Sequence, residues 1–183
     1  MAHGYLVPIS DLSLPGPHSR PVLLYDQIGN ARSSHFKDKP NEFFTVDLFV
    51  NELLNIIKHF KITKYDILGH SWGGMLAAEF ETRVQPKGLK SIIFSNCSTS
   101  LALWEKSRKE LLSQMPNSKE VMELLGAGFG DRVKYRAGLD LFHEAHAYLV
   151  RPIPKELDSA VLDPIFGDKE TGEGGDPTVT INM

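Results

Sequence analysis

The chain has 183 residues, enough for one domain with a hydrophobic core and one inserted subdomain. With 42% hydrophobic and 23% charged residues, its composition is ordinary for a globular protein. A formal net charge of −3 without a basic run excludes the electrostatic pattern of a nucleic-acid-binding protein.

The first predicted elements are a strand and a helix. Pro21–Tyr25 (PVLLY) is a short continuous apolar run, as expected of a strand buried on both faces. Along Val46–Phe60, apolar residues recur at helical spacing and polar residues fill the other face. Thr45 is placed to cap this helix, and Asp47 in its first turn favours the helix dipole. The sequence therefore predicts an amphipathic helix after the strand.

The next segments alternate between strand and helix. Tyr65–Leu68 is short, apolar and ended by a glycine, Gly73–Arg83 is a helical segment rich in small residues, and Leu89–Ser95 is an apolar run of strand length. Strands that alternate with helices are typical of a parallel sheet with helices on its faces. We therefore expect an α/β fold with a mostly parallel sheet.

The second half of the chain has a different character. Three segments have helical patterns, Leu101–Met115, Ser118–Leu125 and Tyr135–Val150, and the glycines of 126–130 predict a flexible break. Asp163–Met183 is rich in Gly, Pro, Asp and Glu and is expected to be loop. No further strand of comparable quality follows Ser95.

The strongest chemical signal is Gly69-His70-Ser71-Trp72-Gly73, which matches the G-x-S-x-G nucleophile elbow. In this motif Ser71 is the nucleophile, and Gly69 and Gly73 flank it because side chains there would collide with backbone. The backbone N–H of Trp72, at the start of the following helix, would be one oxyanion donor. A glycine-rich turn without function is the alternative, but a strand before the motif and a helix after it favour the elbow.

Several segments together resemble the proline iminopeptidase family. They are Tyr25–Asn30 (YDQIGN), Gly69–Ala77 (GHSWGGMLA), Pro86–Lys90 with the strand that follows it, and His143–His146 (HEAH) in a region similar to that family's helical cap. The resemblance implies a partial α/β-hydrolase fold, with the core and its elbow in residues 1–98, a helical cap in 99–165 and a loop or tail in 166–183. It also implies a serine hydrolase that releases N-terminal proline or similar residues from short peptides or amides. An esterase or amidase with the same machinery stays open.

The sequence also departs from this family. The His-Gly-Gly-Pro-Gly stretch that supplies the family's second oxyanion N–H is absent, as are an Asp and a His following the serine in the family's order. We therefore expect a chain truncated at both ends that lacks the triad Asp and His. His70 is expected to pack under the loop, His143 and His146 would have to reach Ser71 from a cap helix, and Asp176 has no framework to place it.

A non-catalytic hydrolase fragment that binds ligands or partners is the alternative function. An incomplete sheet would expose an apolar edge, which predicts self-association. The resemblance implies that Glu144 meets the free amino group of a substrate, as acidic cap residues do in the family, but a solvated glutamate on a helix face is the competing interpretation. His143 and His146 have a metal-compatible spacing without a recognisable third ligand, so we expect no metal and no other cofactor.

The expected compartment follows from three features. The single cysteine, Cys97, excludes an internal disulfide framework. Met1–Ser10 lacks the basic and apolar regions of a signal peptide, and no apolar run approaches the length of a membrane span. We expect a cytoplasmic protein with a small peptide or amide substrate and neither a membrane nor a nucleic-acid partner.

Overall fold

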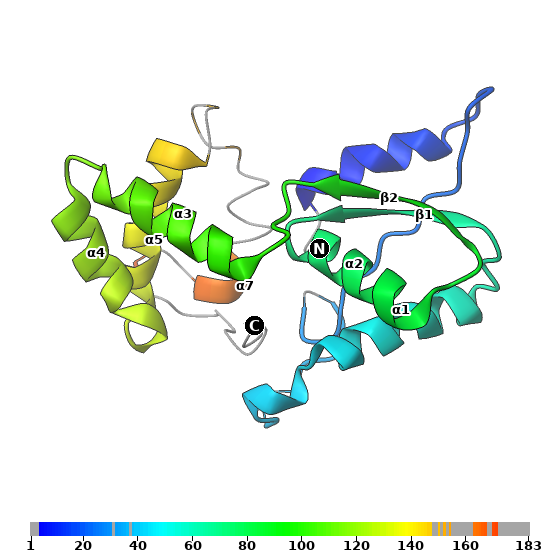
Figure 1. The fold of residues 1–183 in the computed structure, drawn as a ribbon, viewed down its shortest axis with the longest axis horizontal. Coiled ribbons are helices and arrows are strands. Elements are labelled where there is room, and N and C mark those ends of the chain that lie inside the picture. The colour runs from blue at the N-terminus through cyan, green and yellow to red at the C-terminus, as the bar shows by residue number, and fades with distance from the viewer. Residues whose placement is uncertain are drawn as a thin grey trace. The chain divides into compact units, whose positions relative to one another are not determined.

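The structure is a computed structural model that describes residues 4–30, 32–36, 38–147, 150, 152, 154, 163–167 and 170–171. The described chain divides into two compact units (Figure 1). One, here called the sheet unit, is Lys39–Arg108. The other, the helical unit, holds residues 4–38 and the described residues from 109 onward.

The sheet unit is a strand–helix–strand arrangement preceded by a helix. Its elements are η2 (Asn41–Phe43), α1 (Val46–His59), β1 (Tyr65–His70), α2 (Trp72–Val84), β2 (Leu89–Ser95) and the first turns of α3 (Leu101–Ser113). β1 and β2 pair in parallel, with Ile67 opposite Ile92 and Leu68 opposite Ile93. The predicted parallel α/β arrangement is thus confirmed for these strands.

Helix α1 begins where its cap was predicted. The Oγ1 atom of Thr45 accepts a hydrogen bond from the Leu48 N–H at 3.1 Å, and this satisfies one of the N–H groups that the first helical turn leaves without an intrahelical partner. The helix runs to His59, and its apolar stripe buries Phe49 and Val50. The predicted helix is confirmed to within one residue.

The core of the sheet unit lies between its helices and its strands. Helix α2 contributes Leu76, Ala77 and Phe80, of which Phe80 is completely buried, and α1 contributes Phe49 and Val50. Helix α2 packs mainly on β1, the strand that leads directly into it. This packing fixes the direction in which the chain leaves β1 and enters α2.

The strand predicted at Pro21–Tyr25 is wrong. Residues 21–27 form neither helix nor strand, and Leu23 and Leu24 are 41% and 39% exposed instead of buried on both faces. An apolar run becomes a strand only when it forms a hydrogen-bonded ladder with a neighbour. The described sheet contains β1 and β2 alone. The apolar composition of residues 21–25 favoured a strand, but this segment has no partner strand in that sheet.

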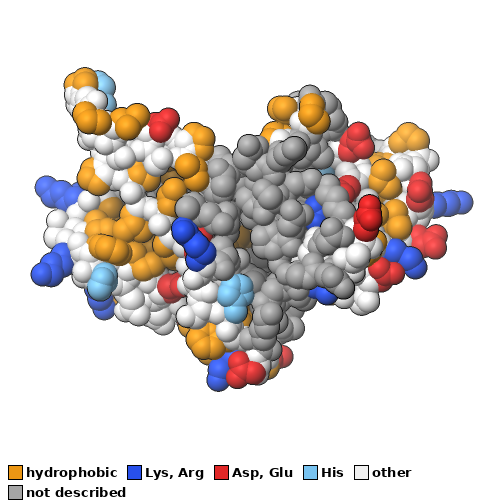
Figure 2. Space-filling model, turned by 180° about the vertical axis from the view of Figure 1, so that it is seen from behind, with side chains coloured by type: hydrophobic (Ala, Val, Ile, Leu, Met, Phe, Trp, Pro, Cys, Tyr) orange, Lys and Arg blue, Asp and Glu red, His pale blue; other side chains and the backbone are white. Residues whose placement is uncertain are grey.

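Apolar side chains of the two strands reach the surface. Leu68 on β1 and its cross-strand neighbour Ile93 on β2 are 40% and 52% exposed, and Phe94 is 55% exposed. Figure 2 shows that hydrophobic side chains also gather on the face turned away from the view of Figure 1. Self-association through the sheet edge stays a prediction, with these strand residues as its candidate surface.

The helical unit contains η1 (Gly4–Ser13), α4 (Ser118–Gly126), η3 (Gly128–Gly130), α5 (Arg132–His146) and the short α7 (Asp163–Phe166). Helices α4 and α5 pack closely, because Gly138 lets α5 approach Leu124 and Leu125. The buried Arg136 donates from Nη1 to the Gly167 carbonyl at 2.8 Å, which ties the end of α7 to α5.

The predicted helices of this half are present with shifted ends. Helix α3 ends at Ser113, and α5 begins at Arg132, three residues earlier than predicted, because Asp131 accepts the Lys134 N–H at 3.1 Å and so caps it. The chain at 163–166 is helical where loop was predicted, and residues 172–183 lie outside the described residues.

Candidate active site

Ser71 lies at a sharp turn between β1 and α2. Its backbone has φ 52° and ψ −120°, a positive-φ conformation that a residue with a side chain rarely adopts. The turn is held from both sides. The Ser71 N–H donates to the Ser95 carbonyl at the end of β2 at 3.0 Å, and the Ser71 carbonyl accepts the Gly74 N–H at 3.0 Å.

The glycines around Ser71 differ in whether a side chain would fit at their positions. A Cβ atom added to Gly69 would overlap the Gly73 carbonyl, and one added to Gly74 would lie 2.6 Å from the Cys97 side chain. No described atom lies within 4 Å of a Cβ placed on Gly73. The collision expected at Gly73 is therefore found one residue later, at Gly74, because that position faces the segment after β2.

Trp72 is the first residue of α2, so its backbone N–H belongs to the first turn, where N–H groups have no intrahelical acceptor. Its ring packs edge-on against Phe49 of α1, with ring centroids 5.8 Å apart. The indole Nε1 is buried, and no acceptor among the described residues bonds it. The Trp72 ring thus packs against α1, while its backbone N–H lies at the N-terminus of α2.

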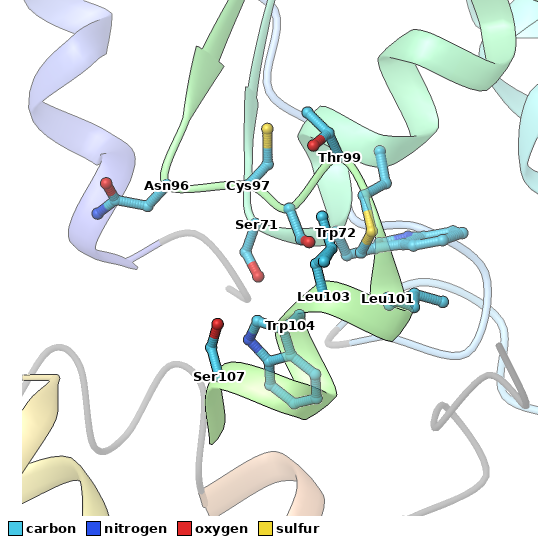
Figure 3. Close-up of a pocket in the computed structure, with 11 residues that line it drawn as sticks. Ser71, Trp72, Asn96, Cys97, Thr99, Leu101, Leu103, Trp104 and Ser107 are labelled. Carbon is cyan, nitrogen blue, oxygen red and sulfur yellow. The ribbon is translucent and has the colours of Figure 1, made fainter. Parts of the chain in front are cut away.

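A cavity of about 520 Å³ opens beside Ser71. Every residue that lines it belongs to the sheet unit. Its apolar wall comes from both α2 and α3, and Figure 3 shows the Ser71 hydroxyl pointing toward the first turns of α3. The lining residues are Ser71, Trp72, Met75, Asn96, Cys97, Ser98, Thr99, Leu101, Leu103, Trp104 and Ser107.

Most of this lining was missed by the sequence analysis. Nine of the eleven residues come from positions other than the elbow itself, chiefly the segment after β2 and the start of α3. Asn96 follows β2 directly, as Ser71 follows β1, and has φ 43°. Because parallel strands end at the same sheet edge, the residues after β2 could have been expected beside the elbow.

Other predicted residues lie in the helical unit. Glu144 is exposed on α5, which also carries His143 and His146, and Asp176 lies outside the described residues. Burial lowers the pKa of His143 below its ordinary value of 6.5, against an opposing effect of the Asp140 charge. The described cavity lining includes neither a histidine nor a carboxylate.

The described part of the chain shows neither a metal site nor a membrane-spanning helix. No group of three or more His, Cys, Asp or Glu side chains is arranged to hold a metal ion. No described helix is both long and apolar enough to cross a membrane.

The family described as "alpha/beta hydrolase fold" matches residues 10–125, a span that includes the elbow and both strands. The chain belongs to this family. The α/β-hydrolase fold class predicted from the sequence is therefore confirmed. Within the family, the chain resembles proteins named proline iminopeptidase.

Three relatives show how far this similarity extends. A proline iminopeptidase of Clostridioides difficile is 33% identical over 146 residues, which are 79% of this chain and 48% of that protein. The crystal structure of a Mycobacterium smegmatis proline iminopeptidase is 32% identical with a TM-score of 0.68, covering 97% of this chain and 66% of that one. That of VinJ is 28% identical with a TM-score of 0.75, covering 92% and 60%. The chain spans about half the length of the curated relatives it matches.

Proposed function

We propose that this α/β-hydrolase chain carries the nucleophile of a serine aminopeptidase that releases N-terminal proline or a similar residue from short peptides or amides. One observation carries the proposal: Ser71 has a strained backbone with positive φ between β1 and the N-terminus of α2, beside a cavity. The similarity to proline iminopeptidases supports the choice of substrate class.

In the proposed reaction, Ser71 Oγ attacks the carbonyl carbon of the N-terminal residue and its proton passes to a general base. The Trp72 N–H donates to the resulting oxyanion, where the N-terminal end of the α2 dipole also favours negative charge. The C–N bond then breaks, the leaving amine takes the proton, and an ester to Ser71 remains. Water hydrolyses this ester and restores the serine. The described cavity lining holds no imidazole or carboxylate, so this step needs a base from outside that lining.

The lining suits a small apolar acyl group. Met75, Leu101 and Leu103 face the cavity from α2 and α3, and apolar area removed from water stabilises binding by about 25 cal/mol per Å². A pyrrolidine ring has no polar group except its amine, so burying it against this apolar wall costs little free energy of desolvation. In this proposal residues 99–165 act as the cap that restricts substrates to short chains, and Glu144 is the candidate partner of the substrate's amino group.

Hydrolysis of L-prolyl 4-nitroanilide by the purified chain tests the proposal. We expect release of nitroaniline, no release from the N-acetylated analogue, and abolished release by the Ser71→Ala variant. Ser113→Ala is the matched control, because the Ser113 hydroxyl donates to the Glu110 carbonyl within its own helix and is not part of the described cavity lining. If Ser71→Ala kept the activity of the parent, the assignment of the nucleophile would be wrong. If the folded parent were inactive, the chain would instead fit the alternative of a ligand-binding fragment.

A further inference from the structure

Two hydrogen-bond donors of α3 lie across the cavity from the nucleophile. In Figure 3, the indole nitrogen of Trp104 and the hydroxyl of Ser107 point into the space that the Ser71 hydroxyl also faces. Trp104 and Ser107 are three residues apart on a helix, so their side chains share one face. Both line the cavity, and both belong to the sheet unit.

The orientation of the Trp104 ring is supported on one side. The Arg108 guanidinium lies over it, 5.4 Å from the ring centroid, one helical turn further along α3. Arg108 is itself held by Glu105, whose two carboxylate oxygens accept from Nη2 at 3.2 and 3.1 Å. Stacking on one face of the indole leaves its N–H edge directed at the cavity.

The chemistry of this pair selects what it can bind. An indole N–H can only donate a hydrogen bond, and a serine hydroxyl can donate one as well. A group held by both must therefore be an acceptor, such as a carbonyl or carboxylate oxygen. The amine of the substrate does not meet this requirement when it is protonated, because it is a donor only.

We propose that Trp104 Nε1–H and Ser107 Oγ–H together bind an oxygen of the substrate's leaving group, on the far side of the scissile amide from the N-terminal residue. This inference rests on the proposed function, which places the scissile carbonyl at Ser71 and its oxygen at the Trp72 N–H. The donors of α3 stand on another wall of the same cavity, so they meet a second oxygen. The pair thus favours peptides, whose next residue carries a carbonyl or carboxylate, over simple amides.

Binding can be measured without turnover in the Ser71→Ala variant. The chain has two tryptophans, so a ¹H–¹⁵N spectrum shows two indole N–H signals, and Trp104→Phe identifies which belongs to Trp104. The buried Trp72 indole gives the second signal. The probes are prolylglycine and prolyl propylamide, which match in length while only prolylglycine has an oxygen beyond the amide.

We expect prolylglycine to shift the Trp104 indole signal more than prolyl propylamide does. Trp104→Phe, which keeps a ring, and Ser107→Ala should each raise the Kd for prolylglycine about two- to tenfold, the range of a net hydrogen bond, and leave that for prolyl propylamide unchanged. The Ser107→Ala result stands by itself if Trp104→Phe does not fold. Equal effects on both probes would overturn the donor pair alone. Binding of neither probe would overturn the proposed function as well.

Discussion

The closest glycine contact of the sheet unit is with backbone atoms alone, whereas that of the helical unit is with both side-chain and backbone atoms. A Cβ added at Gly69 would overlap the Gly73 carbonyl, while one added at Gly138 would lie 2.9 Å from the Leu124 Cβ and 3.0 Å from the Leu125 N. The first approach holds a residue with positive φ at the end of a strand, and the second joins α4 to α5.

The difference separates a glycine that holds a turn from a glycine that lets two helices pack. Backbone atoms of a sheet and a helix cannot move without displacing both elements, so the turn at Ser71 is held to one geometry. Side chains between two helices can shift by a few tenths of an ångström. We therefore expect the sheet unit to tolerate substitution at its closest contact less well than the helical unit does.

The largest expected effect is in the core of the sheet unit. Phe80→Ala removes a completely buried ring from α2, and such truncations cost about 3–5 kcal/mol. Urea denaturation, monitored by circular dichroism, measures this loss of unfolding free energy. Phe129→Ala in the helical unit removes a ring that is 41% exposed, so its loss should be smaller. Equal losses would show that α2 is not packed as described.

Gly69→Ala tests the backbone contact directly. Because the neighbouring atoms are backbone, we expect a loss of about 3 kcal/mol in unfolding free energy, at the upper end for overpacking, together with loss of Ser71 reactivity. Gly73→Ala is the matched control within the same motif, since no described atom would meet its added methyl. If both variants behaved alike, the steric account of the turn would be wrong.

Gly138→Ala is the counterpart in the helical unit. The added methyl crowds Leu124 and Leu125, which costs about 1–3 kcal/mol, but alanine gains about 1 kcal/mol of helix propensity over glycine. We expect a net loss of about 1 kcal/mol, smaller than that of Gly69→Ala, by the same urea measurement. A larger loss than at Gly69 would reverse the comparison between the units.

The smallest effect expected is a pH dependence in the helical unit. Burial lowers the pKa of His143 in the folded state, so below about pH 6.5 the unfolded chain binds the proton more readily than the folded one. His143 therefore lowers stability as the pH falls from about 6.5 toward its folded pKa. In thermal melts from pH 7.5 to 5, His143→Gln should lose less Tm than the parent. The exposed His146 supplies the control variant His146→Gln, which should follow the parent.

Local signals predicted the elements around Ser71 well. The cap at Thr45, the apolar stripe of α1 and the glycine that ends the apolar run of β1 are all encoded within a few residues, so α1, β1, α2 and β2 were found close to their observed bounds. Pro21–Tyr25 was mistaken because strand formation depends on a partner elsewhere in the chain.

The residues of the candidate site likewise divide into those that a local motif predicts and those that depend on distant parts of the chain. Ser71 and Trp72 follow from a five-residue motif, whereas Trp104 and Ser107 show only a helical pattern in the sequence. They become part of the cavity because β2 ends beside β1 and α3 begins shortly after it. No spacing within α3 reveals which of its faces meets Ser71.

The most direct test of the account is labelling of the purified chain with a fluorophosphonate, read by peptide mass spectrometry. Attack by Ser71 Oγ would expel fluoride and leave a phosphonyl group on that side chain. We predict a label on Ser71 that is lost in Ser71→Ala and kept in Ser113→Ala. A folded chain that carried no label at Ser71, or carried it on another serine, would contradict the claim that this turn presents a working nucleophile.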